Sequence, residues 1–118
     1  MKTCRKCLET LDDSFFRKEK RVKDGLGSWC KPCTRKYNLV KRYGEGAVDH
    51  YEKTAYTQDG RCAICDAYPN KIRLALDHCH KSNKLRGLLC GACNTALERI
   101  ESVEDFALKA LKYLKEHE

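Results

Sequence analysis

The chain has 118 residues, of which 42% are hydrophobic and 35% are charged, and nine of its residues are cysteines. A chain this short cannot build two large apolar cores, so bound metal must supply much of its folding free energy. The formal net charge of +7 arises within residues 1–43, where 13 Lys and Arg stand against 5 Asp and Glu, and this favours a polyanionic partner. Because the chain carries no apolar leader or long apolar run, we expect no signal peptide and no membrane span. These features exclude a secreted disulfide scaffold and indicate a cytoplasmic location.

Four Cys-x2-Cys pairs mark the chain at regular intervals: Cys4 and Cys7, Cys30 and Cys33, Cys62 and Cys65, Cys90 and Cys93. Structural zinc takes four tetrahedral ligands, often supplied as such pairs, so eight thiolates predict two Cys4 zinc sites. Sequential pairing closes loops of 22 and 24 residues and is the arrangement we expect. An interleaved cross-brace, typical of protein-interaction adaptors, is the alternative.

The N-terminal part, residues 1–33, is predicted to be the first Cys4 zinc module, with Phe15, Phe16 and Trp29 as its small core. The next part, residues 34–59, lacks proline and carries apolar residues near helical spacing, with a break at residues 44–46. This pattern predicts a linker of two short helices.

Basic residues surround the start of this linker. The three that we expect to contact a nucleic-acid backbone are Lys31, Arg35 and Lys36. Phosphate contacts of this kind position a protein without reading the base sequence.

Residues 60–118 are predicted to form a second, larger zinc module with a C-terminal helix. Its predicted elements are a strand over 72–76, a turn at 82–83, a strand over 85–89, a helix from about Asn94, and a last helix with Ser102 as N-cap. His50 and His117 are interpreted as surface residues. The fold class expected for the whole chain is therefore small α+β.

The segment Asp77-His78-Cys79-His80 carries the chemistry of this module. Since the flanking cysteines satisfy a zinc ion, the acid and the two histidines have no structural task. Oxygen atoms of Asp77 and Asn94 would suit Mg²⁺ or Mn²⁺ better than zinc, and a neutral histidine could deprotonate a water molecule. The competing interpretation is that Asp77 caps the hairpin and Asn94 caps the next helix.

The motifs Asp77-His78-x-His80, Arg86-Gly87-Leu88-Leu89-Cys90 and Cys93-Asn94 lie between the zinc pairs. In this arrangement the chain resembles the recombination endonuclease VII family of HNH (ββα-metal) nucleases, which are mostly phage-encoded. The resemblance covers roughly residues 35–118, and residues 1–33 resemble a small zinc module often found ahead of such domains. It implies a zinc-stabilised ββα-metal domain that cuts DNA, either duplex or branched, and it allows a homodimer.

Position by position, the resemblance implies that Asp77 and Asn94 hold a catalytic Mg²⁺ or Mn²⁺. His78 would then be the general base, and His80 would orient the scissile phosphate. Arg86 is a candidate for a bidentate phosphate contact. The chain departs from endonuclease VII at Cys79, where that enzyme has an acid, and at Leu97, where a second acid is replaced and Glu98 follows one position later.

A second class of function is a non-catalytic zinc protein that binds nucleic acid. Strongly salt-dependent binding without cleavage would favour it. The complete set of Asp77, His78, His80 and Asn94 argues for the nuclease, because a binding module has no use for these residues in combination.

Overall fold

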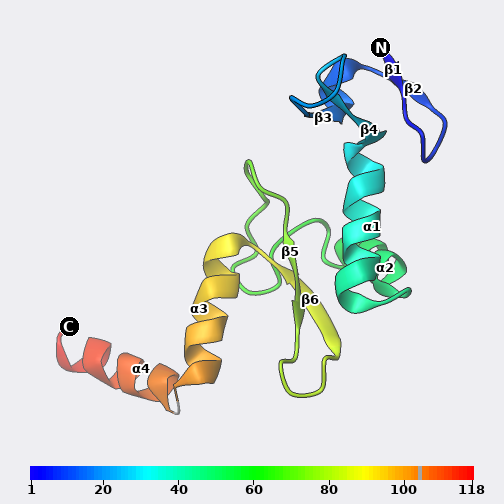
Figure 1. The fold of residues 1–118 in the computed structure, drawn as a ribbon. Helices are drawn as coiled ribbons and strands as arrows, with labels where there is room; N and C mark the ends of the chain where they lie inside the picture. Colours follow the sequence, from blue (N-terminus) through cyan, green and yellow to red (C-terminus); the bar gives the residue numbers. More distant parts are fainter. Residues whose placement is uncertain (104) are drawn as a thin grey trace. The chain divides into compact units, whose positions relative to one another are not determined.

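The computed structural model of the chain describes residues 1–103 and 105–118. Helices and short antiparallel strands alternate along these residues, so the fold is the small α+β class that the sequence predicts (Figure 1). Backbone packing divides the chain into two compact units, Met1–Val48 and Asp49–Glu118, and each is described by itself. Within the described residues, no helix is both long enough and apolar enough to cross a membrane.

The N-terminal unit contains two small antiparallel hairpins followed by a helix. Its elements are β1 (Lys2–Thr3), β2 (Thr10–Leu11), the 3-10 helix η1 (Asp13–Phe15), β3 (Phe16–Lys18), β4 (Leu26–Cys30) and α1 (Lys31–Tyr43). Phe16 is buried, and Trp29 packs against the same cluster, but Phe15 is 44% exposed. The predicted core is therefore correct for Phe16 and Trp29 and wrong for Phe15, because consecutive side chains entering a strand point to opposite faces.

Two helices follow one another with the break that the sequence predicts. Helix α1 ends at Tyr43, and α2 spans Ala47–Thr57. The helix ends where Gly44 adopts a φ of 98° and donates its N–H to the Val40 carbonyl oxygen at 2.8 Å. A positive φ at the helix end is a conformation that glycine adopts without steric cost.

The C-terminal unit is organised around one hairpin, β5 (Ala75–His78) and β6 (Leu85–Leu89). The strands are antiparallel, and Leu76 lies opposite Leu88. Strand β6 has the predicted bounds, whereas the predicted strand over 72–76 is shifted to Ala75–His78. Ile72 is 83% exposed, because β6 ends at Leu89 and leaves no strand opposite it.

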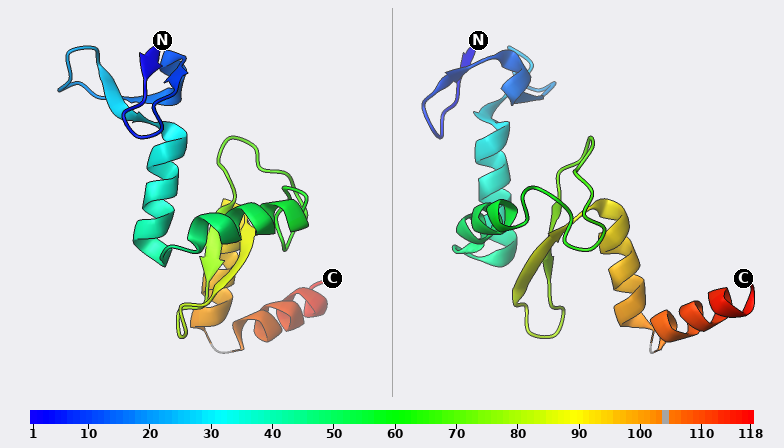
Figure 2. Two further views of the ribbon diagram at one scale, coloured as in Figure 1. Left: turned by 90° about the vertical axis from the view of Figure 1, so that its right-hand side faces the viewer. Right: turned by 180° about the vertical axis from the view of Figure 1, so that it is seen from behind.

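Helices α3 (Gly91–Ser102) and α4 (Phe106–Glu116) complete this unit. Helix α3 packs against both strands of the hairpin, and the hairpin lies between α2 and α3 (Figure 2). The prediction of Ser102 as an N-cap is wrong, since this residue is the last of α3 and Asp105 occupies the N-cap position of α4. The first turn of α3 begins three residues before Asn94, because the last cysteine pair itself starts the helix.

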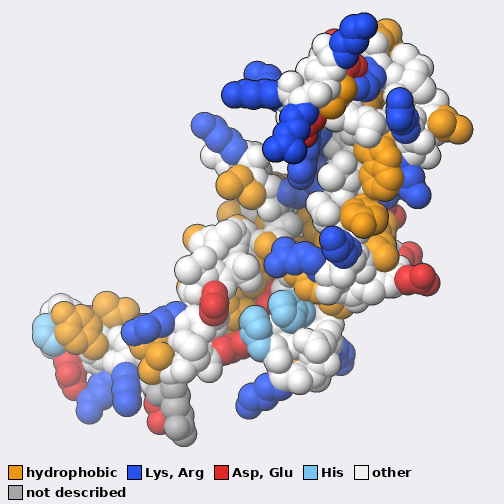
Figure 3. Space-filling model, viewed as in Figure 1, with side chains coloured by type: hydrophobic (Ala, Val, Ile, Leu, Met, Phe, Trp, Pro, Cys, Tyr) orange, Lys and Arg blue, Asp and Glu red, His pale blue; other side chains and the backbone are white. Residues whose placement is uncertain are grey.

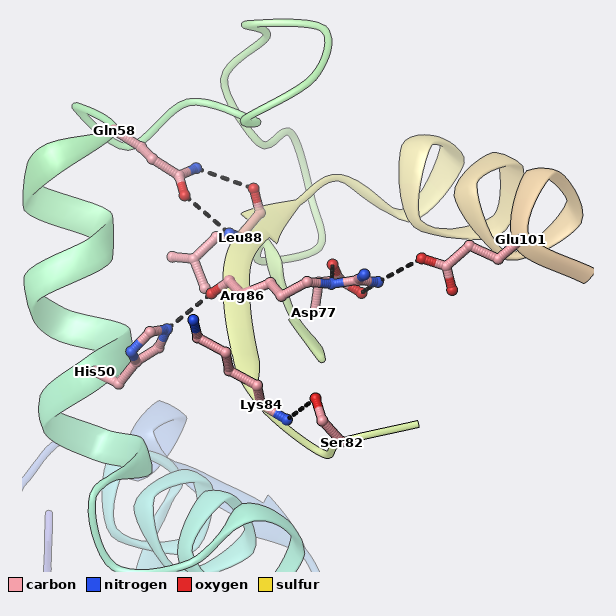
Figure 4. Close-up of polar contacts among 8 residues, drawn as sticks. All are labelled: His50, Gln58, Asp77, Ser82, Lys84, Arg86, Leu88 and Glu101. Carbon is pink, nitrogen blue, oxygen red and sulfur yellow. Dashed lines mark hydrogen bonds and ion pairs between the residues drawn. The ribbon is translucent and has the colours of Figure 1, made fainter. Parts of the chain in front are cut away.

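On the side opposite α3, side chains of α2 and of the turn after it bond the backbone of β6 and of the residue that precedes β5. The Tyr51 hydroxyl donates to the Leu74 carbonyl oxygen at 2.7 Å. The Gln58 amide accepts the Leu88 N–H at 2.9 Å and donates to the Leu88 carbonyl oxygen at 3.0 Å (Figure 4). Contacts to the backbone therefore hold the hairpin between α2 and α3.

Candidate active site and metal centres

The first Cys-x2-Cys pair lies with the second, and the third pair lies with the fourth. The sulfur atoms within each cluster lie within 4.8 Å of one another, and the clusters are Cys4, Cys7, Cys30 and Cys33, then Cys62, Cys65, Cys90 and Cys93. Sequential pairing is therefore confirmed, and the interleaved alternative is wrong. Four thiolates at this separation can hold one tetrahedral zinc ion at each cluster.

The first pair of each cluster forms the same turn. The Leu8 N–H donates to the Cys4 carbonyl oxygen at 2.9 Å, and the Asp66 N–H donates to the Cys62 carbonyl oxygen at 3.0 Å. Leu8 and Asp66 both have a φ of 65°. The two clusters thus share one turn conformation, although the residues between the cysteines are different.

The second pair of each cluster begins a helix. Cys30 and Cys90 are the N-cap residues of α1 and α3, with φ angles of −69° and −68°. Burial raises the pKa of the Cys4 and Cys62 thiols, but backbone N–H groups that donate to their sulfur atoms outweigh burial and lower both pKa values to about 6. Each cluster therefore favours a thiolate at its most buried position, which is the form that binds zinc.

The predicted catalytic residues lie at the end of β5 and just after it. Asp77 and His78 are the last residues of the strand, and the ring centroids of His78 and His80 are 4.6 Å apart. Asp77 is buried, His78 is half-buried and His80 is exposed. Histidine side chains gather on the molecular surface over this hairpin (Figure 3). Asn94 lies exposed in the first turns of α3, the helix that packs against β5.

Arg86 of β6 joins Asp77 to Glu101 of α3, a residue that no sequence motif marks. Its Nε donates to Asp77 Oδ2 at 2.7 Å, and its Nη2 donates to Asp77 Oδ1 at 3.1 Å and to Glu101 Oε1 at 2.8 Å (Figure 4). Its hydrogen bonds raise the pKa of the Arg86 guanidinium above its ordinary value, and the bond to Asp77 has a larger effect than the bond to Glu101. The side chain predicted to contact phosphate thus lies between two carboxylates.

Asp77 and Asn94 offer the donor atoms that a hard divalent cation requires. Arg86 uses one acceptor position on each carboxylate oxygen of Asp77, while each oxygen has two. An Asp oxygen, an Asn amide oxygen and water molecules suit Mg²⁺ or Mn²⁺. Among the described residues, the clusters of three or more His, Cys, Asp or Glu ligands are the two Cys4 groups. The segment Asp77-His78-Cys79-His80 is not part of either group.

His50 of α2 contributes to this region, although the sequence predicts it to be a surface residue. It is half-buried, and its Nε2 lies 2.8 Å from the Arg86 carbonyl oxygen. Since a carbonyl oxygen only accepts, the ring donates from Nε2. The interpretation of His50 as a surface residue is wrong because its partner is distant in sequence. His117 is exposed, as predicted, and stacks on Tyr113.

The cations predicted to contact nucleic acid belong to the N-terminal unit. Lys31 and Lys36 are exposed in α1, and Arg35 is half-buried. Lys and Arg side chains cover much of the face of this unit that Figure 3 shows. The structure thus keeps a cationic surface on the same unit as the first cysteine cluster.

Residues 34–116 match the family described as recombination endonuclease VII. The chain belongs to this family. Two curated relatives are the Gene 59 proteins of Mycobacterium phages L5 and D29, which are 41% identical over 68 residues and 40% identical over 57 residues. These matches cover 56% and 48% of the chain but 42% and 34% of the relatives, so the chain spans less than half of their length.

Among solved structures, the chain is similar to the ββα-Me type II restriction endonuclease Hpy99I. The TM-score is 0.48 and the sequence identity is 23%, and the match covers 98% of this chain and 65% of that one.

Proposed function

We propose that the chain is a metal-dependent HNH endonuclease that hydrolyses phosphodiester bonds in DNA. The observation that carries this proposal is the match of residues 34–116 to the recombination endonuclease VII family. Within that segment, the β5–β6 hairpin and α3 carry the acid, the two histidines and the asparagine that such chemistry needs. The proposal assigns residues 60–118 to the nuclease domain, 34–59 to a helical linker and 1–33 to an added zinc module.

The proposed roles follow from donor chemistry and exposure. Asp77 and Asn94 would hold Mg²⁺ or Mn²⁺, which supplies polarisation of the scissile phosphate and stabilisation of the leaving oxygen. The half-buried His78 would take the proton from the attacking water. The exposed His80, with its ring beside His78, would contact and orient the phosphate.

The cysteine clusters would hold structural zinc and take no part in the reaction. The second cluster joins the turn after α2 to the start of α3, so its zinc would fix the helix that carries Asn94 against the hairpin. Lys31 of the first module, with Arg35 and Lys36 of the linker, would add affinity for the phosphate backbone. The proposal includes duplex or branched DNA as substrate, assembly as a homodimer, and action in the host cytoplasm.

Cleavage assays on supercoiled plasmid and on a synthetic four-way junction test the proposal. Wild-type protein with both zinc sites filled is expected to cut when Mg²⁺ or Mn²⁺ is added. The variant His78→Ala should lose at least about 100-fold in rate, since a positioned general base contributes about that much. His117→Ala, which removes the exposed histidine at the C-cap of α4, is the matched control and should cut like wild type.

DNA binding by His78→Ala separates chemistry from recognition, and it should stay near the wild-type level. A fully zinc-loaded wild type that binds both DNAs in a salt-dependent manner and cuts neither would contradict the proposal. That result would instead support a non-catalytic nucleic-acid-binding protein.

A further inference from the structure

Two ion pairs that share one guanidinium connect three elements of the C-terminal unit. Arg86 on β6 forms a bidentate pair with Asp77 on β5 and a second pair with Glu101 near the end of α3. The side chains of Asp77, Arg86 and Glu101 are 11%, 34% and 35% exposed. Fully solvated surface ion pairs contribute little to stability. These two contacts are partly buried, so a larger contribution is expected of them.

The bidentate contact fixes the plane of the Asp77 carboxylate. Two parallel N–H···O bonds define both the position and the rotation of a carboxylate, which a single bond cannot do. The lone pairs that Arg86 leaves free then point in fixed directions. A cation that binds to those lone pairs meets an oriented ligand.

Glu101 and Asp77 share one nitrogen of Arg86. The same nitrogen, Nη2, donates to Asp77 Oδ1 at 3.1 Å and to Glu101 Oε1 at 2.8 Å. The guanidinium charge is thus divided between two carboxylates from separate elements. Without Glu101, the full positive charge of Arg86 would act on Asp77 alone.

The same contact fixes the rotation of α3 about its axis. Asn94 precedes Glu101 by seven residues, which is close to two helical turns, so both side chains lie on one face of α3, about 10 Å apart along the axis. Because Glu101 is held toward the hairpin by Arg86, Asn94 is presented on the face of α3 that contains this contact. One ion pair therefore places the helix that carries the second proposed ligand.

We propose that Arg86 and Glu101 are positioning residues for a divalent cation at Asp77. Arg86 orients the Asp77 carboxylate at the cost of a nearby positive charge, and Glu101 offsets that charge and aligns α3. This inference rests on the proposed function, in which Asp77 and Asn94 hold the cation. It assigns Arg86 to the metal site rather than to the phosphate backbone.

The two residues are expected to change metal affinity in opposite directions. Removing the Glu101 charge in Glu101→Gln should weaken Mn²⁺ binding roughly five-fold, because a nearby carboxylate charge attracts a divalent ion even in water-like surroundings. Removing the Arg86 charge in Arg86→Gln should strengthen it by a similar factor. Cleavage by Arg86→Gln should still fall by about ten-fold or more, because Asp77 loses its orientation.

Mn²⁺ titration of zinc-loaded protein, followed by the electron paramagnetic resonance signal of free Mn²⁺, measures these affinities without DNA. Glu116→Gln is the matched control, since Glu116 is an exposed carboxylate of α4 paired with Lys112. Arg86→Lys keeps the charge and the partner of Asp77 but loses the bidentate contact. It should bind Mn²⁺ like wild type and cut more slowly.

The outcomes separate this inference from the proposed function. If wild type binds Mn²⁺ and cuts, while Glu101→Gln and Arg86→Gln bind Mn²⁺ with unchanged affinity, the two residues act only in stability and the inference is overturned. If Arg86→Gln instead loses DNA affinity and salt dependence while Arg86→Lys keeps its salt dependence, Arg86 is a phosphate contact and the inference is likewise overturned. A wild type that binds no Mn²⁺ beyond its zinc sites overturns the proposed function itself.

Discussion

Single side chains supply the hydrogen bonds that a third strand would otherwise give to β6. Among the described residues, this strand pairs with β5 alone, so its other edge carries backbone groups that need partners. Gln58 satisfies both the N–H and the carbonyl oxygen of Leu88, and His50 satisfies the Arg86 carbonyl oxygen. Because these bonds hold the backbone of β6, they also hold the guanidinium that extends from it.

Replacing Gln58 by alanine should therefore destabilise the C-terminal unit. Leu88 is completely buried, so its N–H would lose its partner in a place that water reaches poorly, whereas its carbonyl oxygen would keep the Ala63 N–H at 3.0 Å. We expect the free energy of unfolding to fall by about 2 kcal/mol. Urea unfolding of zinc-loaded protein at a fixed free zinc concentration measures this change.

The control for this variant is Thr57→Ala, one position earlier. Its hydroxyl donates to the Lys53 carbonyl oxygen within the same helix and is exposed, so its loss should change stability by less than about 0.5 kcal/mol. Equal losses of unfolding free energy in the two variants would show that the Gln58 bonds to β6 do not stabilise the C-terminal unit.

The two cysteine clusters were predictable from the sequence, but the partners of the proposed site residues were not. Cysteine spacing predicts the clusters, and the segment around Asp77 stands out because it places an acid and two histidines between cysteine pairs that are complete without them. Glu101 and His50 reach the site through contacts with β6, and no local pattern marks either one. Helical spacing from Asn94 was the one signal that could have drawn attention to Glu101.

Among the elements, the break between α1 and α2 depends on one glycine. Gly44 has a φ of 98°, and a Cβ there would meet no heavy atom within 4 Å, so a substitution changes only the backbone energy. Gly44→Ala should lower the free energy of unfolding by about 1 kcal/mol, because alanine disfavours positive φ. Gly46 also has open space around it but no positive φ, so Gly46→Ala should be neutral or slightly stabilising. Comparing the two melting temperatures tests this, and similar losses would contradict it.

Element boundaries were predicted well where local chemistry decides them and poorly where tertiary pairing does. Strand β6 and the glycine break agree with the sequence patterns. Strand β5 begins three residues later than predicted, since pairing starts only where Ala75 meets Leu89. The last helix begins at Phe106 rather than after Ser102, because α3 continues through that serine.

On the scale of the whole molecule, each compact unit has its own cysteine cluster and its own small core. Cys4 and Cys30 are buried with Phe16 in the first unit. In the second, buried Cys62 accompanies the buried leucines of the hairpin, Leu76, Leu88 and Leu89. Apolar burial on this scale is too small to stabilise either unit alone, so metal binding and folding should be coupled within each one.

Removing one buried cysteine should therefore unfold one unit and spare the other. Cys4→Ser is expected to lower the zinc content from two ions per chain to one and to abolish amide exchange protection in β3 and β4, while β5 and β6 stay protected. Cys62→Ser should give the reverse pattern, because its cluster fixes the start of α3 against the hairpin. Hydrogen exchange with mass spectrometry, together with zinc analysis, measures both effects. Loss of protection across the whole chain in either variant would show that the two units fold as one cooperative structure.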